Sequence, residues 1–337
     1  MALDTSSSGS SPTSKAFARH VAPFAPLALA LVMNAVPAST SAPEIVAMEP
    51  AGTGITAVKC VEVTDSQDCH SRYPTGCSGT GGSYDAYLNY WKNQLIDPTT
   101  ASTPASTPVK YFTQLADYQK LDASIPSGLK QNDQDNFQDQ LKQLGEGQQY
   151  GIIGYLYYSQ HTSAETSNCD LTGPPGDPNY GNVDYHIGIG FDPAVAQQLR
   201  SDTTTAPAAT SANMTASGKR TTKRPTSSGT GASVLEQSSV IVEMTPHDRF
   251  QYENNIWTLK NLQLATGRQV RVVGQLIIDN EHNLTSQNCA IAQTAADKKT
   301  CWRASAWELH PVVLFQVCPS ESCALDSTDW VDLDQLQ

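Results

Sequence analysis

Four short segments of the chain place a carboxylate close to a histidine. They are Asp184 with His186, Glu243 with His247, Asp279 and Glu281 with His282, and Glu308 with His310. Carboxylate oxygens and neutral imidazoles bind divalent cations, and a carboxylate can also orient a histidine or activate water. These residue types are therefore those of a metal site or an acid–base centre.

Two of the pairs have the i, i+2 spacing that places both side chains on one face of a β-strand. Asp184 and His186 would share a face with Gly188, and Glu308 would share one with His310, directly before Pro311. The candidate catalytic residues are Asp184, His186, Glu243, Glu308 and His310. The candidate ligands of a divalent metal, the one cofactor this pattern favours, are His186, His247, Asp279, Glu281, His282 and His310.

A structural interpretation of the same residues competes with the chemical one. An acidic residue two positions from a histidine often forms a simple ion pair on the outer face of a sheet. Segments such as Thr-Pro-His and Asp-Asn-Glu-His also have the composition of turns. The two interpretations differ in geometry, because a hydrolytic centre requires at least three of these side chains to meet in one cleft.

The elements that would position these residues are strands. Period-two hydrophobic patterns occupy residues 150–160, 183–191, 238–246, 268–279 and 302–317. A short helical stripe, Trp257, Leu259, Leu262 and Ala265, lies between the third and fourth strands and is closed by Gly267. This order predicts an α+β protein with a five-stranded OB-like β-barrel.

The regions around the barrel have other compositions. Residues 1–45 have the pattern of a signal or leader segment, with an apolar run at Leu27–Val36. Residues 46–148 form a Cys-containing region with helical stripes around Trp91 and Leu141, the second closed by Gly145. The barrel is expected over residues 149–318, with a disordered insertion at 201–233, and an acidic tail at 319–337.

The eight cysteines and the formal net charge of -12 limit the classes of protein to which this chain can belong. An even number of cysteines behind a signal segment favours disulfides, and Cys289–Cys301 and Cys60 with Cys69 or Cys77 would close short loops. The acidic balance is no signature of nucleic-acid binding. From the signal segment and the even number of cysteines, we expect a secreted or periplasmic protein with no membrane span in its mature form.

Several motifs of the predicted barrel resemble those of a known protein group. The segments GYLYY, VDYHIGI, VIVEMTPH, RVVGQLIIDNEH and WELHPV occur in order between Tyr150 and Cys318. In this they resemble uncharacterised bacterial exported proteins with an OB-like domain. The resemblance implies the fold, and it brings no activity or catalytic residue to this chain.

Two functions from different classes remain. The first is a binding module whose ligand is an oligosaccharide, a protein or an oligonucleotide, with Tyr155, Tyr157 and Tyr185 available for stacking. The second is a metal-dependent hydrolase, such as a phosphodiesterase or nuclease, that uses the Asp/Glu and His residues. The sequence has no nucleophile elbow, phosphate loop or His-Glu-x-x-His segment.

Overall fold

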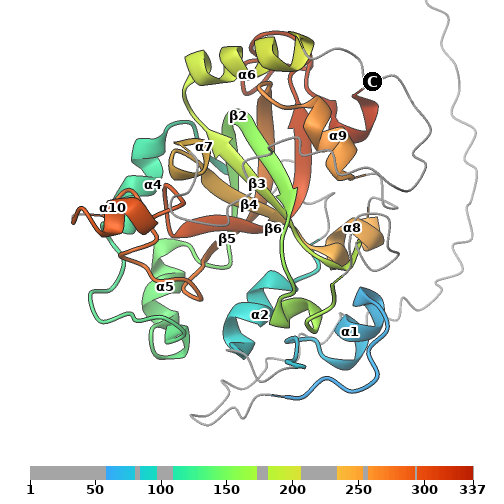
Figure 1. Cartoon of the computed structure of the whole chain (residues 1–337), viewed down its shortest axis with the longest axis vertical. Helices are drawn as coiled ribbons and strands as arrows, with labels where there is room; N and C mark the ends of the chain where they lie inside the picture. The colour runs from blue at the N-terminus through green and yellow to red at the C-terminus, as the bar shows by residue number, and fades with distance from the viewer. Residues whose placement is uncertain are drawn as a thin grey trace, which may run out of the picture. The chain divides into compact units, whose positions relative to one another are not determined.

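Five strands close into a mixed β-barrel, as the sequence predicts (Figure 1). The strands are β2 (Gln149–His161), β3 (Tyr185–Gly190), β4 (Val240–Met244), β5 (Gln269–Ile278) and β6 (Trp307–Val317). The computed structural model describes residues 58–79, 84–96, 109–172, 181–205, 234–252, 257–292 and 294–336. The predicted leader at 1–45 and most of the predicted insertion, residues 206–233, lie outside the described residues.

The barrel has the connectivity of an OB-type fold. β2, β3 and β4 form an antiparallel meander, β4 pairs with β6 in parallel, β6 pairs antiparallel with β5, and β5 returns to β2. Alternate residues of each strand, such as Ile187 on β3 and Val242 on β4, enter the main hydrophobic core. The residues between them therefore face outward from the barrel.

Shorter elements extend the sheet beyond the barrel. β1 (Lys110–Phe112) pairs in parallel with β2, and β7 (Val331–Asp332) pairs with β6. The sequence patterns did not predict either strand. Because Trp330 and Leu333 in the acidic tail are buried, this part of the chain packs against the barrel.

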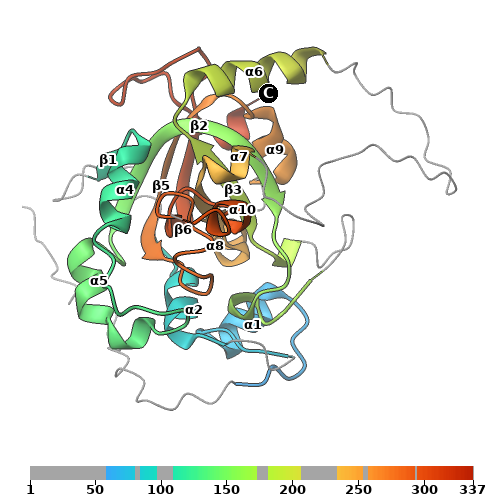
Figure 2. The ribbon, with the colours of Figure 1, turned by 60° about the vertical axis from the view of Figure 1, so that its left-hand side comes forward.

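Helices cover the outside of the sheet (Figures 1 and 2). Those of the Cys-containing region are α1 (Ser66–Arg72), α2 (Ala86–Lys92), α4 (Leu115–Asp122), η1 (Gln134–Asn136) and α5 (Gln138–Leu144). Those that follow are η2 (Thr166–Asn168), α6 (Pro193–Thr205), α7 (Val234–Gln237), α8 (Pro246–Tyr252), α9 (Leu259–Leu264), α10 (Asp297–Thr300) and η4 (Leu333–Gln335).

The helices around Trp91, Leu141 and Leu262 form where the hydrophobic stripes predict them. Gly145 ends α5 with a φ of 112°, a left-handed conformation that favours glycine. Among the described residues, no helix has both the length and the hydropathy needed to cross a bilayer.

All eight cysteines form disulfides, in the pairs Cys60–Cys77, Cys69–Cys169, Cys289–Cys301 and Cys318–Cys323. The predicted Cys289–Cys301 pair is confirmed, and Cys60 takes the second of its two proposed partners. Cys69–Cys169 spans 100 residues and ties α1 to the loop between β2 and β3. No local sequence pattern predicts a disulfide between two cysteines that are so far apart in the chain.

Candidate functional site

The register of three neighbouring strands brings the acid and histidine residues together. His186 on β3 lies directly opposite Glu243 on β4, and Val242 on β4 pairs with Leu309 on β6. Because Val242 and Leu309 point into the core, the next residue on each strand, Glu243 and His310, faces outward. The outer face of the sheet therefore carries His186, Glu243 and His310 side by side.

His310 lies at the centre of a buried group of carboxylates. Its Nδ1 is 3.1 Å from Glu243 Oε2 and 3.6 Å from Glu308 Oε1, and its Nε2 is 3.4 Å from Asp184 Oδ2. His186 Nδ1 approaches the other oxygen of Glu243, Oε1, at 3.3 Å. The i, i+2 pairs predicted from the sequence, Asp184 with His186 and Glu308 with His310, thus belong to one cluster.

An irregular segment of β6 makes this arrangement fit. The pairing of β5 with β6 shifts register on either side of Gly274, opposite the His310–Pro311 segment. Leu309 and Val312 both enter the core although three positions separate them, so His310 and Pro311 form an outward bulge. This is consistent with the expectation that proline ends regular pairing at this point.

Burial and ion pairing together set the pKa values of the residues in this cluster. Burial opposes the charged form of His310, but Glu243, Glu308 and Asp184 outweigh it and raise the pKa of His310 to about 10. Burial raises the pKa of Glu243, but the attraction of His310, His186 and Lys92 outweighs burial and lowers this pKa to about 2. Burial raises the pKa of Asp184 to about 8 and that of Glu308 to about 7. His310 and Glu243 are therefore the charged pair of the cluster.

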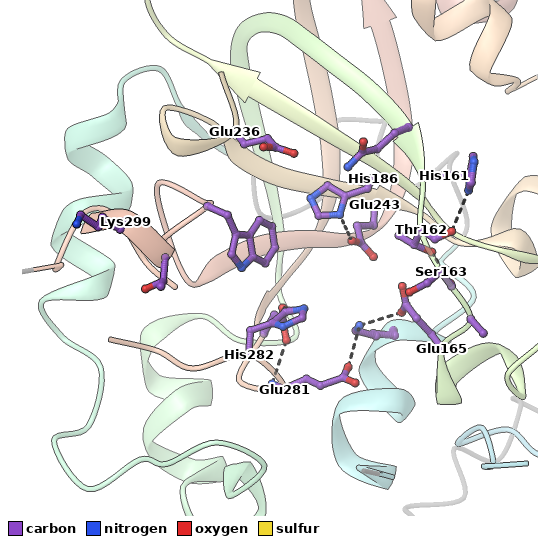
Figure 3. Close-up of a pocket in the computed structure, with 16 residues that line it drawn as sticks. His161, Thr162, Ser163, Glu165, His186, Glu236, Glu243, Glu281, His282 and Lys299 are labelled. Carbon is purple, nitrogen blue, oxygen red and sulfur yellow. Dashed lines mark hydrogen bonds and ion pairs between the residues drawn. The ribbon is translucent and has the colours of Figure 1, made fainter. Parts of the chain in front are cut away.

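A pocket of about 720 Å³ opens beside this cluster (Figure 3). His186 and Glu243 project into it from β3 and β4, and His282 and Glu281 lie below them in the view of Figure 3. Asp279 also lines it, so five of the predicted acid and histidine residues share one cleft. This meets the geometric requirement for a hydrolytic centre, namely that at least three of these side chains share one cleft.

Two loops form the walls of the pocket. The end of β2 and the loop after it contribute residues 160–165. The loop after β5 contributes Asp279, Glu281, His282, Lys299, Thr300 and Trp302. The indole of Trp302 lies between two imidazoles, with ring centroids 5.4 Å from His186 and 5.2 Å from His282. The Cys289–Cys301 disulfide closes the loop directly before Trp302, which restricts where the indole can move.

Asp279 is held by an arginine rather than left open to a ligand. Arg303 Nη1 donates to Asp279 Oδ2 at 2.7 Å, and Arg303 Nη2 donates to the Asp279 carbonyl at 2.7 Å. Burial raises the pKa of Asp279, but the attraction of Arg303 outweighs it and keeps the pKa well below its usual range. His282 Nε2 is 3.7 Å from the same Oδ2 and its side chain is 44 % exposed, so His282 is the more accessible partner.

The Cys-containing region completes the pocket through Lys92 at the end of α2. Lys92 Nζ is 3.2 Å from Glu165 Oε2 and 3.8 Å from Glu281 Oε2, and its side chain is only 6 % exposed. Burial lowers the pKa of Lys92, but the attraction of Glu165, Glu281 and Glu243 outweighs it, and the pKa lies well above its usual value. Lys92 thus links the two loops that form the walls.

α2 is held in place by hydrogen bonds to the barrel. Gln275 on β5 donates to the Trp91 carbonyl at 2.9 Å, and Thr245 donates to the Lys92 carbonyl at 3.2 Å. Asn93 donates through Nδ2 to the Ser167 carbonyl at 2.9 Å. The helical region is therefore a structural part of the site.

Other predicted residues lie elsewhere. β4 ends at Met244 and Pro246 begins α8, so His247 turns onto a helix and stacks on His70 with ring centroids 4.2 Å apart. Tyr185 lies in the core, beneath the guanidinium of Arg249 at 3.7 Å. Tyr157 is buried with its hydroxyl on Asp192, and Tyr155 is half-buried on β2. None of these four residues is among those that line the pocket.

The pocket also contains residues that the sequence did not single out. They include Lys92, Glu165, Glu236, Lys299, Thr300 and Trp302. Tyr158 lies beside them, packed on Gly188 with its ring 6.2 Å from His186, and fills the space that the small residue leaves. Most of these residues come from loops or helices whose position depends on tertiary packing, so no periodic pattern marks them.

The pocket occupies the surface that OB-type barrels use for ligands, namely the second and third strands with the loops after the first and fourth. Those elements here are β3, β4 and the two wall loops. In comparisons with known proteins, no family model, no curated protein and no solved structure matches this chain. The assignment of the site therefore depends on its own geometry.

Proposed function

We propose that this protein is a binding module that takes a polar ligand in the pocket between β3, β4 and the two wall loops. The observation that carries the proposal is the position of the pocket on the ligand surface of an OB-type barrel. Its volume of about 720 Å³ is within the range of small-molecule sites.

The charges of the pocket favour a sugar over a phosphate-bearing ligand. Two lysines, Lys92 and Lys299, stand against five carboxylates: Glu165, Glu236, Glu243, Asp279 and Glu281. Excess negative charge repels phosphates. Carboxylates accept hydrogen bonds from sugar hydroxyls, and a neutral imidazole can accept one and donate one. Trp302 supplies an aromatic face against which a sugar ring can pack. We therefore propose an oligosaccharide as the ligand.

The test is a binding screen of the full chain against neutral and acidic oligosaccharides and a single-stranded oligonucleotide, measured by calorimetry. Replacing Trp302 with Ala should weaken sugar binding at least about fivefold, since a packed aromatic at a binding site contributes more than about 1 kcal/mol. Tyr155→Ala, on β2 and outside the pocket lining, is the matched control and should bind like the wild type. Oligonucleotide binding without sugar binding would contradict the proposal.

A second function, hydrolysis of the bound ligand, is favoured by the convergence of His186, Glu243, Asp279, Glu281 and His282 in one pocket. Burial raises the pKa of Glu281 to about 7, a value suited to proton transfer near neutral pH. The assay is product formation from glycoside and phosphodiester substrates with added divalent metal, by the wild type and Glu281→Gln. Turnover that is equal in both proteins would exclude Glu281 from catalysis.

We also propose that the protein is exported. Four disulfides support this, because disulfides persist in oxidising compartments. The test is mass spectrometry of the protein recovered outside the cytoplasm. Removal of the predicted leader, residues 1–45, would support export, and an intact chain confined to the cytoplasm would contradict it.

A further inference from the structure

Five polar atoms meet in the buried cluster without a hydrogen bond of regular geometry. They are Asp184 Oδ2, Glu243 Oε2, Glu308 Oε1 and both ring nitrogens of His310. The four residues are at most 5 % exposed, so water does not satisfy these atoms from bulk solvent. These atoms face one another at 3.1 to 3.6 Å without forming aligned hydrogen bonds. This is a costly arrangement for buried polar atoms, and a shared cation would relieve it.

We propose that Asp184, Glu243 and His310 bind a divalent cation beneath the floor of the pocket. One donor atom from each of the three residues lies within 4.8 Å of the others. Donors about 2.1 Å from a shared ion lie about 3.0 to 3.5 Å apart, so any pair of the three has to close by no more than about 1.8 Å. His310 Nδ1 faces Glu243 Oε2 and its Nε2 faces Asp184 Oδ2, and one of these two nitrogens serves as ligand.

The charges of the three residues match a divalent ion. A bound cation displaces the protons of its ligands, which leaves two carboxylates and a neutral imidazole with two negative charges in total. The three ligands and a divalent ion are therefore neutral together, which suits a site with almost no solvent exposure. A mixed set of imidazole and carboxylate ligands suits Zn²⁺ or Mn²⁺. Of the two, we commit to Zn²⁺, because low coordination numbers fit a three-residue site with a position left open.

Neighbouring side chains hold the ligands in the required orientation. Asn168 Nδ2 donates to Asp184 Oδ1 at 3.1 Å, which leaves Oδ2 for the ion. His186 Nδ1 is 3.3 Å from Glu243 Oε1, which leaves Oε2 for the ion. Hydrogen bonds of this kind are the usual outer support of metal ligands.

Glu243 also connects the cation site to solvent. It lines the pocket while its Oε2 faces His310, so an ion can enter through the pocket. The inference is independent of the proposed oligosaccharide, since metal binding is measured without any organic ligand. Failure of either one therefore leaves the other standing.

The experiment uses the full chain, dialysed against a chelator and then titrated with Zn²⁺ by calorimetry. We expect one ion per chain, and at least about a tenfold loss of affinity in Glu243→Gln and in His310→Gln. The matched control is His282→Gln, a pocket histidine outside the cluster, which should bind Zn²⁺ like the wild type. Removing the outer support in Asn168→Ala should weaken binding by about 10- to 100-fold.

Binding of Co²⁺ to the wild-type protein gives a readout that does not depend on whether the variants fold. Visible absorption bands of Co²⁺ with nitrogen and oxygen ligands, competed away by Zn²⁺, would support the site. A folded wild-type protein that binds neither ion would overturn the proposal. So would loss of Zn²⁺ in His282→Gln equal to that in Glu243→Gln, because the ion would then lie in the open pocket.

Discussion

At the scale of single residues, Glu243 is the connection between the pocket and the interior. One of its oxygens faces His186 in the pocket wall, and the other faces His310 in the buried cluster. Burial raises the pKa of Glu243, but the attraction of His310, His186 and Lys92 outweighs it and lowers the pKa to about 2, so the carboxylate is charged at neutral pH. A change at Glu243 should therefore affect stability and the site together.

We predict that Glu243→Gln lowers the free energy of unfolding of the chelator-treated protein by about 3 to 5 kcal/mol. The reason is that the substitution leaves His310 buried with its principal counter-charge removed. Denaturant unfolding of Glu243→Gln, His310→Gln and the double variant gives the coupling between them. The double variant should be less destabilised than the sum of the single ones by at least about 1 kcal/mol, and strict additivity would show that the two side chains do not interact.

At the scale of elements, α1 and α8 meet through two stacked imidazoles. His70 on α1 and His247 on α8 are stacked at 4.2 Å with an interplanar angle of 18°. Burial, and then the proximity of His247, lower the pKa of His70 to about 3. The contact therefore requires a neutral ring.

The stacked pair predicts acid sensitivity of the α1–α8 contact. In the unfolded chain His70 titrates near 6.5, and in the folded protein near 3, so between these pH values only the unfolded chain binds the proton. Stability from this residue is complete above pH 6.5 and falls by about 1.4 kcal/mol per pH unit as the pH drops below it. His70→Phe keeps an aromatic ring on His247 and removes the titration.

The measurement is the free energy of unfolding between pH 4 and pH 7.5 for the wild type and His70→Phe. The difference between the two proteins should grow in favour of the variant as the pH falls. Since other groups titrate in both proteins, only this difference reports on His70. Parallel pH profiles would show that His70 is not held neutral in the fold.

The elements that the sequence predicts well are those with an uninterrupted pattern. The alternation around Ile187 and Val242 identifies β3 and β4, and the stripe closed by Gly145 identifies α5. β1 spans only three residues, which is too short for a pattern. His247 was grouped with Glu243 because they are close in sequence, but Pro246 starts a helix and turns the histidine away.

The site was predicted less completely than the barrel. Asp184, His186, Glu308 and His310 could be placed on shared faces because strand spacing fixes the side on which they project. Their convergence depends on the parallel pairing of β4 with β6, which joins segments more than sixty residues apart. Lys92 could not be found in advance, since its side chain enters the pocket only after α2 docks on the barrel.

At the scale of the whole molecule, that docking makes the Cys-containing region and the barrel one structural unit. The Cys69–Cys169 disulfide joins α1 to η2, and α2 contacts the same turn through Asn89 and Thr166. η2 in turn carries Asn168, the hydrogen-bond partner of Asp184. A loosened connection at η2 should therefore reach both the pocket and the buried cluster.

We predict that removing Cys69–Cys169 with two serines destabilises the protein more than removing Cys318–Cys323 in the same way. The first disulfide closes a separation of 100 residues and the second a separation of 5. The entropy of loop closure in the unfolded chain gives about 4.7 kcal/mol for the first and about 2 kcal/mol for the second. Denaturant unfolding under non-reducing conditions measures both, and the reverse order would mean that native contacts around Cys318 outweigh the long-range link.

Hydrogen exchange should rise in α1 and η2 only when Cys69–Cys169 is removed, because that bond alone connects the two elements covalently.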